Sequence, residues 1–345
     1  MGPFPIGLRS VPHAANKRAM TLSLPPEWAP HERVWIGFPS NADEWPAGLD
    51  APRAEIAAFA NAVHAGGRGE RVVLVAGDAA SADAARALVE PGVEVEEHRI
   101  GDVWLRDTGP IIVTGEARPI ALDFGFNGWG GKYEMAGDED IAPRLAGTLP
   151  LVVRKRDWVF EGGAIDVDGA GLGVTTEQCL LHPNRNPWAS RAEIEVRLRE
   201  DLGVDRLLWL GSGLLNDHTD GHVDNLARFV ASGRIALPDP TDDDPNEAVY
   251  RDARHRARAF GLEVVPIPSA GKVERNGQIV PASYMNFYIG NAVVVVPVYG
   301  AANDDVAVAA IADLFPGRDT IGLRADAVLA GGGSFHCISQ QVPRG

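Results

Sequence analysis

Residues 293–317 read VVVVPVYGAANDDVAVAAIADLFPG, and this stretch combines the two patterns that decide the fold class. The run Val293–Val296 is apolar and β-branched, which is typical of a buried strand. Asn303–Asp305 then provide a helix start, apolar residues recur at helical spacing from Val308 to Leu314, and a Pro-Gly pair follows. The stretch therefore predicts a strand followed by a helix.

The same alternation continues in both directions from this unit. One predicted helix begins at Asp50 and ends at the glycines that follow residue 65. Another begins after Ser190, where Glu193 completes a capping box. Further predicted strands are the apolar runs Val72–Val75, Ile111–Val113, Leu151–Val153 and Leu207–Leu210. Alternating strands and helices predict an α/β or α+β architecture.

The composition is that of a globular protein without an internal linker. Hydrophobic residues make up 45 % and charged residues 23 % of the 345 residues. No low-complexity segment or change of composition divides the chain, so we expect one domain over residues 20–345, built from several similar units. Residues 1–19 are basic and precede a more regular sequence that opens at Met20. We expect them to form a flexible extension.

Charge and cysteine content narrow the class of partner. The 47 acidic residues outnumber the 32 basic ones, which gives a formal charge of −15. This excess argues against a nucleic-acid partner and would attract small cations, although it also fits simple solubility. Two cysteines cannot build a disulfide framework, so we expect a reducing, cytoplasmic location. The longest apolar run, residues 292–298, is too short to span a bilayer, so no membrane association is expected.

The most informative polar cluster is GGGSFHCISQQ, residues 331–341. Three glycines allow close approach of the backbone to a ligand, and Cys337 follows them directly. Cys179, in contrast, precedes two leucines and is interpreted as a small buried hydrophobe. On a strand, His336 would point to the face opposite Cys337, so we do not expect it to be the catalytic base.

A second cluster, residues 217–224, reads DHTDGHVD. In an extended segment, His222 and Asp224 would share one face, and a histidine beside a carboxylate is a good proton shuttle. A metal site that uses His218 and His222 is an alternative, since their spacing suits a helix. Gly221 argues against that helix. A solvated polar loop also remains open.

Three further segments carry weaker signals. Residues 104–110 (WLRDTGP) and 161–163 (EGG) each place one carboxylate, Asp107 or Glu161, beside a turn-forming glycine. The segment 126–133, FNGWGGKY, has the composition of a mobile lid, but it also fits a surface loop anchored by Trp129.

Together these segments resemble the agmatine deiminase family, within the superfamily of guanidine-modifying enzymes. The resemblance runs from about Pro25 to Pro343. Its motifs are ERVWIGFP at residues 32–39, W-x-R-D-x-G-P at 104–110, EGG at 161–163, GHVD at 221–224 and GGG-x-x-HC-x-x-QQ at 331–341. Five motifs in this order are highly specific. One departure is Ser334-Phe335, where the family commonly has Asn-Ile.

The resemblance implies a five-bladed α/β propeller with pseudo-fivefold symmetry. It also implies hydrolysis of agmatine to N-carbamoylputrescine and ammonia, a reaction of polyamine and putrescine biosynthesis. By family position, Cys337 is the nucleophile, His222 the general acid and base, and Asp107, Glu161 and Asp224 the carboxylates around the guanidinium. No metal or cofactor is implied.

The chemistry of a guanidinium fits this set of residues. The group is planar and always charged, and carboxylates bind it through paired hydrogen bonds. Its carbon is a poor electrophile because of resonance, so a strong nucleophile such as a thiolate is required. A histidine can protonate the departing ammonia and then activate the water that hydrolyses the amidino-cysteine.

Several alternatives remain open from the sequence. The enzyme could deiminate a peptidyl-arginine or another guanidine, or it could be an amidinotransferase. A non-catalytic polyamine- or guanidine-binding protein is a further class, although the pair Cys337 and His222 argues against it. Trp104 and Trp129, with the acidic pair Asp43 and Glu44, are candidates for binding the far end of agmatine. The sequence leaves the oligomeric state, including a homo-oligomer, open.

Overall fold

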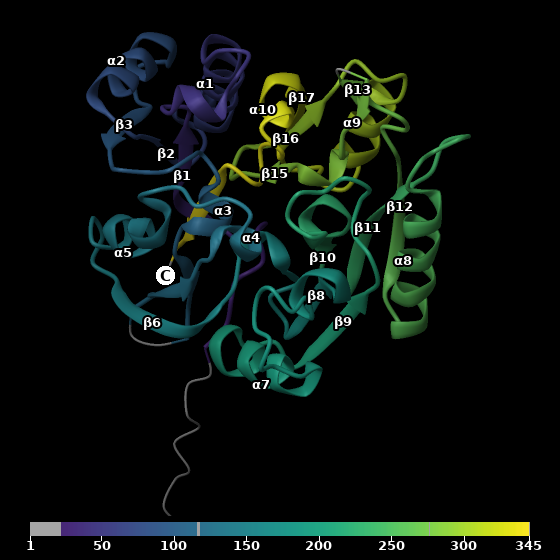
Figure 1. Cartoon of the computed structure of the whole chain (residues 1–345). Coiled ribbons are helices and arrows are strands. Elements are labelled where there is room, and N and C mark those ends of the chain that lie inside the picture. The colour runs from purple at the N-terminus through teal and green to yellow at the C-terminus, as the bar shows by residue number, and fades with distance from the viewer. Residues whose placement is uncertain (1–21, 116–117, 276, 345) are drawn as a thin grey trace, which may run out of the picture.

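The computed structural model describes residues 22–115, 118–275 and 277–344, which form a series of small mixed sheets with helices around them (Figure 1). The predicted extension, residues 1–19, lies outside these ranges. In the described ranges, no helix combines the length and the apolar character needed to cross a membrane.

Five sheets of the described chain share one pattern. In each, an edge strand pairs antiparallel with a middle strand, and the middle strand pairs parallel with the next strand along the chain. The first sheet also has a fourth strand, parallel to the third. The strands, grouped by sheet, are β18 (Ser339–Pro343), β1 (His31–Phe38), β2 (Arg71–Ala76) and β3 (Glu94–Glu97); β4 (Ile111–Val113), β5 (Ile120–Gly125) and β6 (Val152–Val159); β7 (Asp166–Val167), β8 (Leu172–Thr176) and β9 (Arg206–Leu210); β10 (Arg228–Ala231), β11 (Arg234–Asp239) and β12 (Glu263–Pro268); β15 (Tyr288–Ile289), β16 (Val293–Val298) and β17 (Asp319–Arg324). A separate hairpin joins β13 (Glu274–Arg275) and β14 (Gln278–Ile279).

Helices connect the parallel strands, because a parallel pair requires a crossover rather than a tight turn. The connecting helices are α1 (Asp50–His64), α2 (Ala79–Leu88), α5 (Ile141–Ala146), α7 (Arg191–Leu202), α8 (Glu247–Phe260) and α9 (Asp304–Ala312). In Figure 1, α1, α2, α7 and α8 lie at the periphery of the molecule. The shorter helices are α3 (Leu105–Thr108), α4 (Gly128–Gly131), α6 (Glu177–Leu180) and α10 (Asp326–Ala330).

The first and last strands of the described chain belong to one sheet. Strand β18 pairs antiparallel with β1, and Gln340 lies opposite Trp35. In Figure 1 the yellow C-terminal strand accordingly runs beside the purple β1. This pairing places the segment that precedes β18, with Cys337, against the beginning of the chain.

The predicted α/β class is confirmed, and the predicted elements are found at their positions. The five predicted strands correspond to β2, β4, β6, β9 and β16. Helix α1 spans the predicted residues, and the Ser190–Glu193 capping box is present at the start of α7. Helix α9 ends at Ala312, so Leu314 lies beyond it. The last turn tightens, with Leu314 N–H donating to Ile311 O and Phe315 N–H to Ala312 O, and Pro316 cannot continue the helix because it has no backbone N–H to donate.

Each sheet buries apolar side chains against its helices. All four valines of Val293–Val296 are buried, and Ala307 and Ile311 of α9 are buried in the same cluster. Full burial of one valine contributes roughly 1.5–3 kcal/mol relative to exposure. The apolar run in the sequence therefore forms a rigid central strand of its sheet, and this sheet supports the polar turn that precedes it.

Candidate active site

A short turn precedes the edge strand of each of the five similar sheets, and polar side chains on or beside these turns meet in the interior. The turns are α3 before β4, the 3-10 helices Gly162–Ala164 before β7, Val223–Asn225 before β10 and Tyr284–Asn286 before β15, and the segment 331–338 before β18. They contribute Asp107, Glu161, His222, Asp224, Asn286 and Cys337. The structure thus brings together the five residues for which the resemblance implied catalytic roles, and it adds Asn286.

Cys337 lies in a turn and is 5 % exposed. Its Sγ accepts a hydrogen bond from Asn286 Nδ2 at 3.0 Å and lies 3.5 Å from Asp224 Oδ2. Burial raises the pKa of the thiol well above its usual range, and the carboxylates of Asp224 and Asp107 raise it further. Without another cation in the site, Cys337 is therefore protonated at neutral pH.

Gly333 makes room for this arrangement. A Cβ atom at this position would lie 2.6 Å from the Trp104 ring and 3.1 Å from Cys337 Sγ. The first distance is shorter than any real contact of this kind, so a side chain here would displace the indole. The glycine-rich approach that the sequence suggested is thus required between Trp104 and the thiol.

His222 is fully buried among carboxylates. Its Nδ1 lies 3.6 Å from Asp107 Oδ1, and its Nε2 lies 3.7 Å from Glu161 Oε2. Burial acts to lower the pKa of His222, but Asp107, Cys179 and Glu161 outweigh burial and raise that pKa well above its usual value. An imidazolium in this position can act first as a proton donor.

The local geometry of this segment differs from the prediction. His222 precedes a 3-10 helix that contains Asp224, rather than sharing an extended strand with it. The carboxylates beside the imidazole are consequently those of Asp107 and Glu161. The alternation rule failed because Gly221, with φ of 84°, bends the chain directly before His222.

Asp107 is held by two donors from other elements. Its Oδ1 accepts the backbone N–H of Gly163 at 2.9 Å, and its Oδ2 accepts Trp129 Nε1–H at 3.0 Å. Burial raises the pKa of Asp107, and the neighbouring carboxylates of Asp224 and Glu161 contribute to this rise. Three carboxylates face one imidazolium, so a planar cation entering the site would balance their charge.

Arg185, a residue that was not predicted from the sequence, fixes Glu161. Arg185 Nε donates to Glu161 Oε1 at 2.7 Å, and both side chains are fully buried. Arg185 also binds Asp220 Oδ2 at 2.6 Å. Glu161 Oε2 has no hydrogen-bond partner, which leaves one carboxylate oxygen available in the site.

A cavity of about 240 Å³ leads to Cys337. Its wall includes Asp107, Trp104 and Trp129, and two further carboxylates, Glu44 and Asp102, also line it. Asp43, the other acidic candidate, is exposed and does not line it. The remaining lining residues are Pro46, Tyr133, Met135, His218, Thr219, Ala330, Gly331, Gly332 and Gly333. None of the described lining residues is a lysine or an arginine.

The segment 126–133 lies at the side of this cavity. Trp129 and Tyr133 both line it, and Trp129 has a left-handed φ of 52°. Lys132 Nζ binds His218 O at 2.8 Å, and the Tyr133 hydroxyl contacts His218 Nδ1 at 3.1 Å. The segment is therefore tied both to Asp107 and to the loop that carries His218.

Cys179 is fully buried, as predicted for a small hydrophobe, but its surroundings are not ordinary. Ligand atoms of Glu161, Cys179 and His222 all lie within 4.8 Å of one another, so these three groups could hold a metal ion by geometry. His218 is not part of this group, so the alternative metal pair His218 and His222 is not brought together. The second ligand position of Glu161, Oε1, is taken by Arg185, whose charge would repel a metal cation.

Asn286 and Arg185 are the residues that sequence reasoning missed. The predicted polar clusters at residues 104–110, 161–163, 217–224 and 331–341 precede the edge strands β4, β7, β10 and β18, and they leave a gap before the fifth edge strand, β15, near residue 285. Asn286 occupies this gap, directly before strand β15. Arg185 had no such signal, because its partners are 24 and 35 residues away.

Comparisons with known proteins agree with this geometry. A profile of the family described as Porphyromonas-type peptidyl-arginine deiminase matches residues 23–343. The chain is 37 % identical to an agmatine deiminase of Stutzerimonas stutzeri, over 93 % of this chain and 95 % of that protein. Among solved structures, it is similar to an agmatine deiminase of Enterococcus faecalis, with a TM-score of 0.88 and 31 % identity over 94 % of this chain and 96 % of that one.

A further solved structure is an agmatine deiminase of C. jejuni with substrate bound. It has a TM-score of 0.87 and 28 % identity over 94 % of this chain and 97 % of that one. The sequence resemblance is thus confirmed over nearly the whole described chain. This protein belongs to the Porphyromonas-type peptidyl-arginine deiminase family.

Proposed function

We propose that this protein is an agmatine deiminase, which hydrolyses agmatine to N-carbamoylputrescine and ammonia. The main support for this function is the chemistry of the cavity wall. Carboxylates and aromatic rings line the cavity from Cys337 outward, and its described lining has no lysine or arginine. Agmatine carries a guanidinium at one end and an ammonium at the other, and both cations suit this lining. The relatives named above support the same substrate.

The far end of agmatine would lie at the outer part of the cavity. Glu44 and Asp102 would attract the ammonium, and Trp104 and Trp129 would pack on the aliphatic chain and the cation. Burial raises the pKa of Asp102 to about 6, so this carboxylate is mostly ionised at neutral pH. Free arginine would bring its own carboxylate to the same region, without a cationic side chain to receive it.

In the proposed reaction, Asp107 and Asp224 bind the guanidinium and Cys337 attacks its carbon. The positive charge of the substrate lowers the pKa of the thiol, which burial and the carboxylates otherwise raise, so the thiol releases its proton to solvent through the cavity and Cys337 attacks as the thiolate. Attack forms a C–S bond, and His222 gives a proton to the departing ammonia as the C–N bond breaks. Water then adds to the amidino-cysteine and loses a proton to His222, and the C–S bond breaks to release the carbamoyl product.

We also infer that the five similar sheets are the blades of an α/β propeller with pseudo-fivefold symmetry. Two observations support this. The sheets share strand order and direction, and the turn before each edge strand sends a side chain to the same site. For the same reason we propose that residues 20–345 are a single catalytic domain, since no single sheet supplies the whole site. The cytoplasmic location stays a prediction, supported by the need to keep Cys337 reduced.

A substrate panel tests the proposed function. Ammonia release is measured with agmatine, free arginine and blocked arginine peptides. We expect kcat/KM for agmatine to exceed that for arginine at least about 100-fold, because an unmatched buried carboxylate costs about 3 kcal/mol. Equal values for agmatine and arginine would contradict the assignment, and a preference for the peptides would favour a peptidyl-arginine deiminase.

The same assay after dialysis against a strong chelator tests the role of Glu161, Cys179 and His222. We expect the rate to be unchanged, because His222 and Glu161 serve the guanidinium rather than a metal and Cys179 is structural. A loss of activity that zinc or manganese restores would assign the cluster to metal chemistry.

A further inference from the structure

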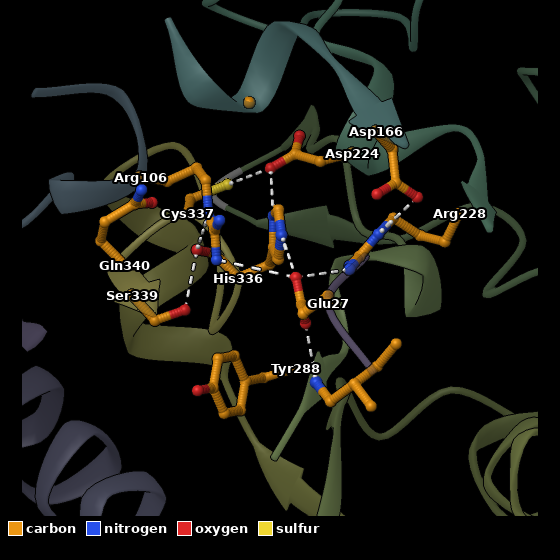
Figure 2. A network of polar contacts seen from close by, with 12 residues as sticks. Glu27, Arg106, Asp166, Asp224, Arg228, Tyr288, His336, Cys337, Ser339 and Gln340 are labelled. Atoms are coloured by element: carbon orange, nitrogen blue, oxygen red, sulfur yellow. Dashed lines mark hydrogen bonds and ion pairs between the residues drawn. The ribbon is translucent and has the colours of Figure 1, made fainter. Parts of the chain in front are cut away.

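Behind Cys337, a buried chain of charged side chains connects the nucleophile to the beginning of the described chain (Figure 2). His336 Nδ1 lies 2.8 Å from Asp224 Oδ2, and His336 Nε2 lies 2.7 Å from Glu27 Oε2. Glu27 Oε2 also binds Arg228 Nη2 at 2.7 Å, and Arg228 Nε lies 3.3 Å from Asp166 Oδ2. The series reads Asp224, His336, Glu27, Arg228 and Asp166, so acidic and basic groups alternate.

Neither carboxylate beside His336 is a hydrogen donor in its ionised form. Burial acts to raise the pKa of Glu27, but Arg228 and His336 lower it well below its usual value. Burial also acts to raise the pKa of Asp224, and the hydrogen bond from His336 is the main cause that lowers it. With both carboxylates ionised, each ring nitrogen of His336 must donate, so the ring carries both protons.

This geometry differs from the one that sequence alone suggested for His336. His336 and Cys337 lie in a turn rather than on a strand, so their side chains are not forced to opposite faces. The ring reaches Asp224, whose Oδ2 is 3.5 Å from Cys337 Sγ. Asp224 Oδ1 is buried and has no hydrogen-bond partner. His336 thus binds Oδ2 of Asp224, and Oδ1 remains available to accept a hydrogen bond from a substrate.

We propose that His336 is a positioning residue of the nucleophilic centre: its doubly protonated ring fixes the rotation of Asp224 and offsets the charge of that carboxylate beside Cys337. With Oδ2 held by the ring, Oδ1 of Asp224 is directed to the substrate guanidinium. This role rests on Cys337 being the nucleophile of the proposed function. His336 itself touches neither substrate nor the reacting atoms.

The charge of His336 bears directly on the thiol. Asp224 raises the pKa of Cys337, and a positive ring bound to Asp224 opposes that effect. The other charged groups around His336 are Glu27, Asp166, Arg228 and Arg106, whose Nε donates to the His336 carbonyl oxygen at 3.3 Å. Glu27 has two arginine partners, Arg228 and Arg106, whereas the cationic partner of Asp224 is His336, at 2.8 Å. Removal of the ring therefore leaves the buried Asp224 carboxylate next to the sulfur without this cationic partner.

The test is the pH dependence of Cys337 alkylation by iodoacetamide, a neutral reagent that needs no substrate. The modified cysteine is identified by mass spectrometry of its peptide, and His336→Gln is compared with the wild-type protein. A glutamine side chain is neutral and cannot donate to both carboxylates. We expect the alkylation midpoint to rise by about one pH unit, because the variant loses the positive charge bound to Asp224 Oδ2, which lies 3.5 Å from the sulfur. We also expect kcat/KM for agmatine to fall about 100-fold near pH 7 and to recover in part at higher pH.

His31→Gln is the matched control. His31 is also buried, and its Nδ1 lies 3.0 Å from Glu70 Oε1 in a comparable histidine–carboxylate pair that does not contact Asp224 or Cys337. We expect this variant to lose thermal stability without a change in the alkylation midpoint. If His336→Gln does not fold, His336→Asn provides the same loss of charge with a shorter side chain.

The outcomes separate this inference from the proposed function. An unchanged midpoint in a folded His336 variant, or a loss of kcat/KM that is equal at all pH values, would overturn the positioning role. Failure of the wild-type protein to release ammonia from agmatine would overturn the substrate assignment, while a shifted midpoint would still support the role of His336.

Discussion

At the scale of single residues, the two cysteines show how much a thiol depends on its neighbours. Both are buried, but Cys337 faces a cavity and receives a hydrogen bond from Asn286, whereas Cys179 is enclosed behind His222 and Glu161. Burial raises the pKa of both thiols. Only Cys337 lies where an arriving cation could reverse this effect.

Cys337→Ser is therefore expected to lower kcat at least about a thousandfold, because a neutral hydroxyl is a far weaker nucleophile toward a delocalised cation. Cys179→Ser is expected to lower kcat less than about tenfold, since a hydroxyl can replace the thiol beside His222. Steady-state ammonia release from both purified variants measures the difference. Full activity of Cys337→Ser would refute the assigned nucleophile.

The intermediate offers a second measurement at the same scale. In His222→Ala, loss of the proton donor and acceptor should slow both halves of the reaction, and hydrolysis of the amidino-cysteine should suffer as well as its formation. We expect mass spectrometry after an acid quench with agmatine to find the amidino adduct on the peptide that contains Cys337. An adduct on Cys179 would contradict the mechanism.

At the scale of elements, α4 and the two residues after it join the cavity to the rest of the site. Trp129 binds Asp107, which is part of the proposed guanidinium site, and Tyr133 binds His218 at the side of the cavity. The two aromatic residues lie four positions apart but have different partners. Changes to them should therefore affect different kinetic constants.

Tyr133→Phe removes only the hydroxyl bond to His218, so we expect KM for agmatine to rise about three- to tenfold with kcat nearly unchanged. Trp129→Phe removes the indole N–H that fixes Asp107, so kcat should fall about tenfold or more as well. Trp188→Phe is the control, because Trp188 is 50 % exposed and does not line the cavity. Equal kinetic effects of the Tyr133 and Trp129 variants would contradict these separate roles.

At the scale of the whole molecule, buried carboxylates make stability depend on pH. Asp138 is buried, its Oδ1 accepts the N–H of Gly101 at 2.8 Å, and its Oδ2 has no hydrogen-bond partner. Burial raises the pKa of Asp138 to about 7. Since the unfolded chain has the ordinary lower pKa, the folded state is progressively penalised as pH rises from about 4 to about 7.

Asp138→Asn keeps an oxygen acceptor but removes the buried charge. We expect the variant to gain stability relative to the wild-type protein, with a smaller gain near pH 5 and the full gain, a rise in Tm of about 2 °C or more, at pH 8. Thermal denaturation followed by circular dichroism at the two pH values measures this. Asp140→Asn, which changes an exposed carboxylate of the same 3-10 helix, should show no gain that grows with pH. A gain of equal size at both pH values would argue against a raised pKa of Asp138.

The sequence by itself determined the α/β class, the strands and helices with clear local signals, and membership in the family. The valine run of β16 and the capping box of α7 depend on neighbours within a few residues, so they can be read from the chain directly. The polar turns near residues 107, 161, 222 and 337 were also recognisable, because each combines a reactive side chain with glycine. Their assigned catalytic roles remain proposals.

Only the tertiary structure decided which groups act on one another. Cys337 and Asn286 are 51 residues apart, and His336 and Glu27 are 309 residues apart. Local patterns carry no information about such pairs, because the pairing of β18 with β1 and the packing of separate sheets create them. The protonation of Cys337 and His222 is set by the low-polarity interior and by charges from distant segments, and these exist only after the chain has folded.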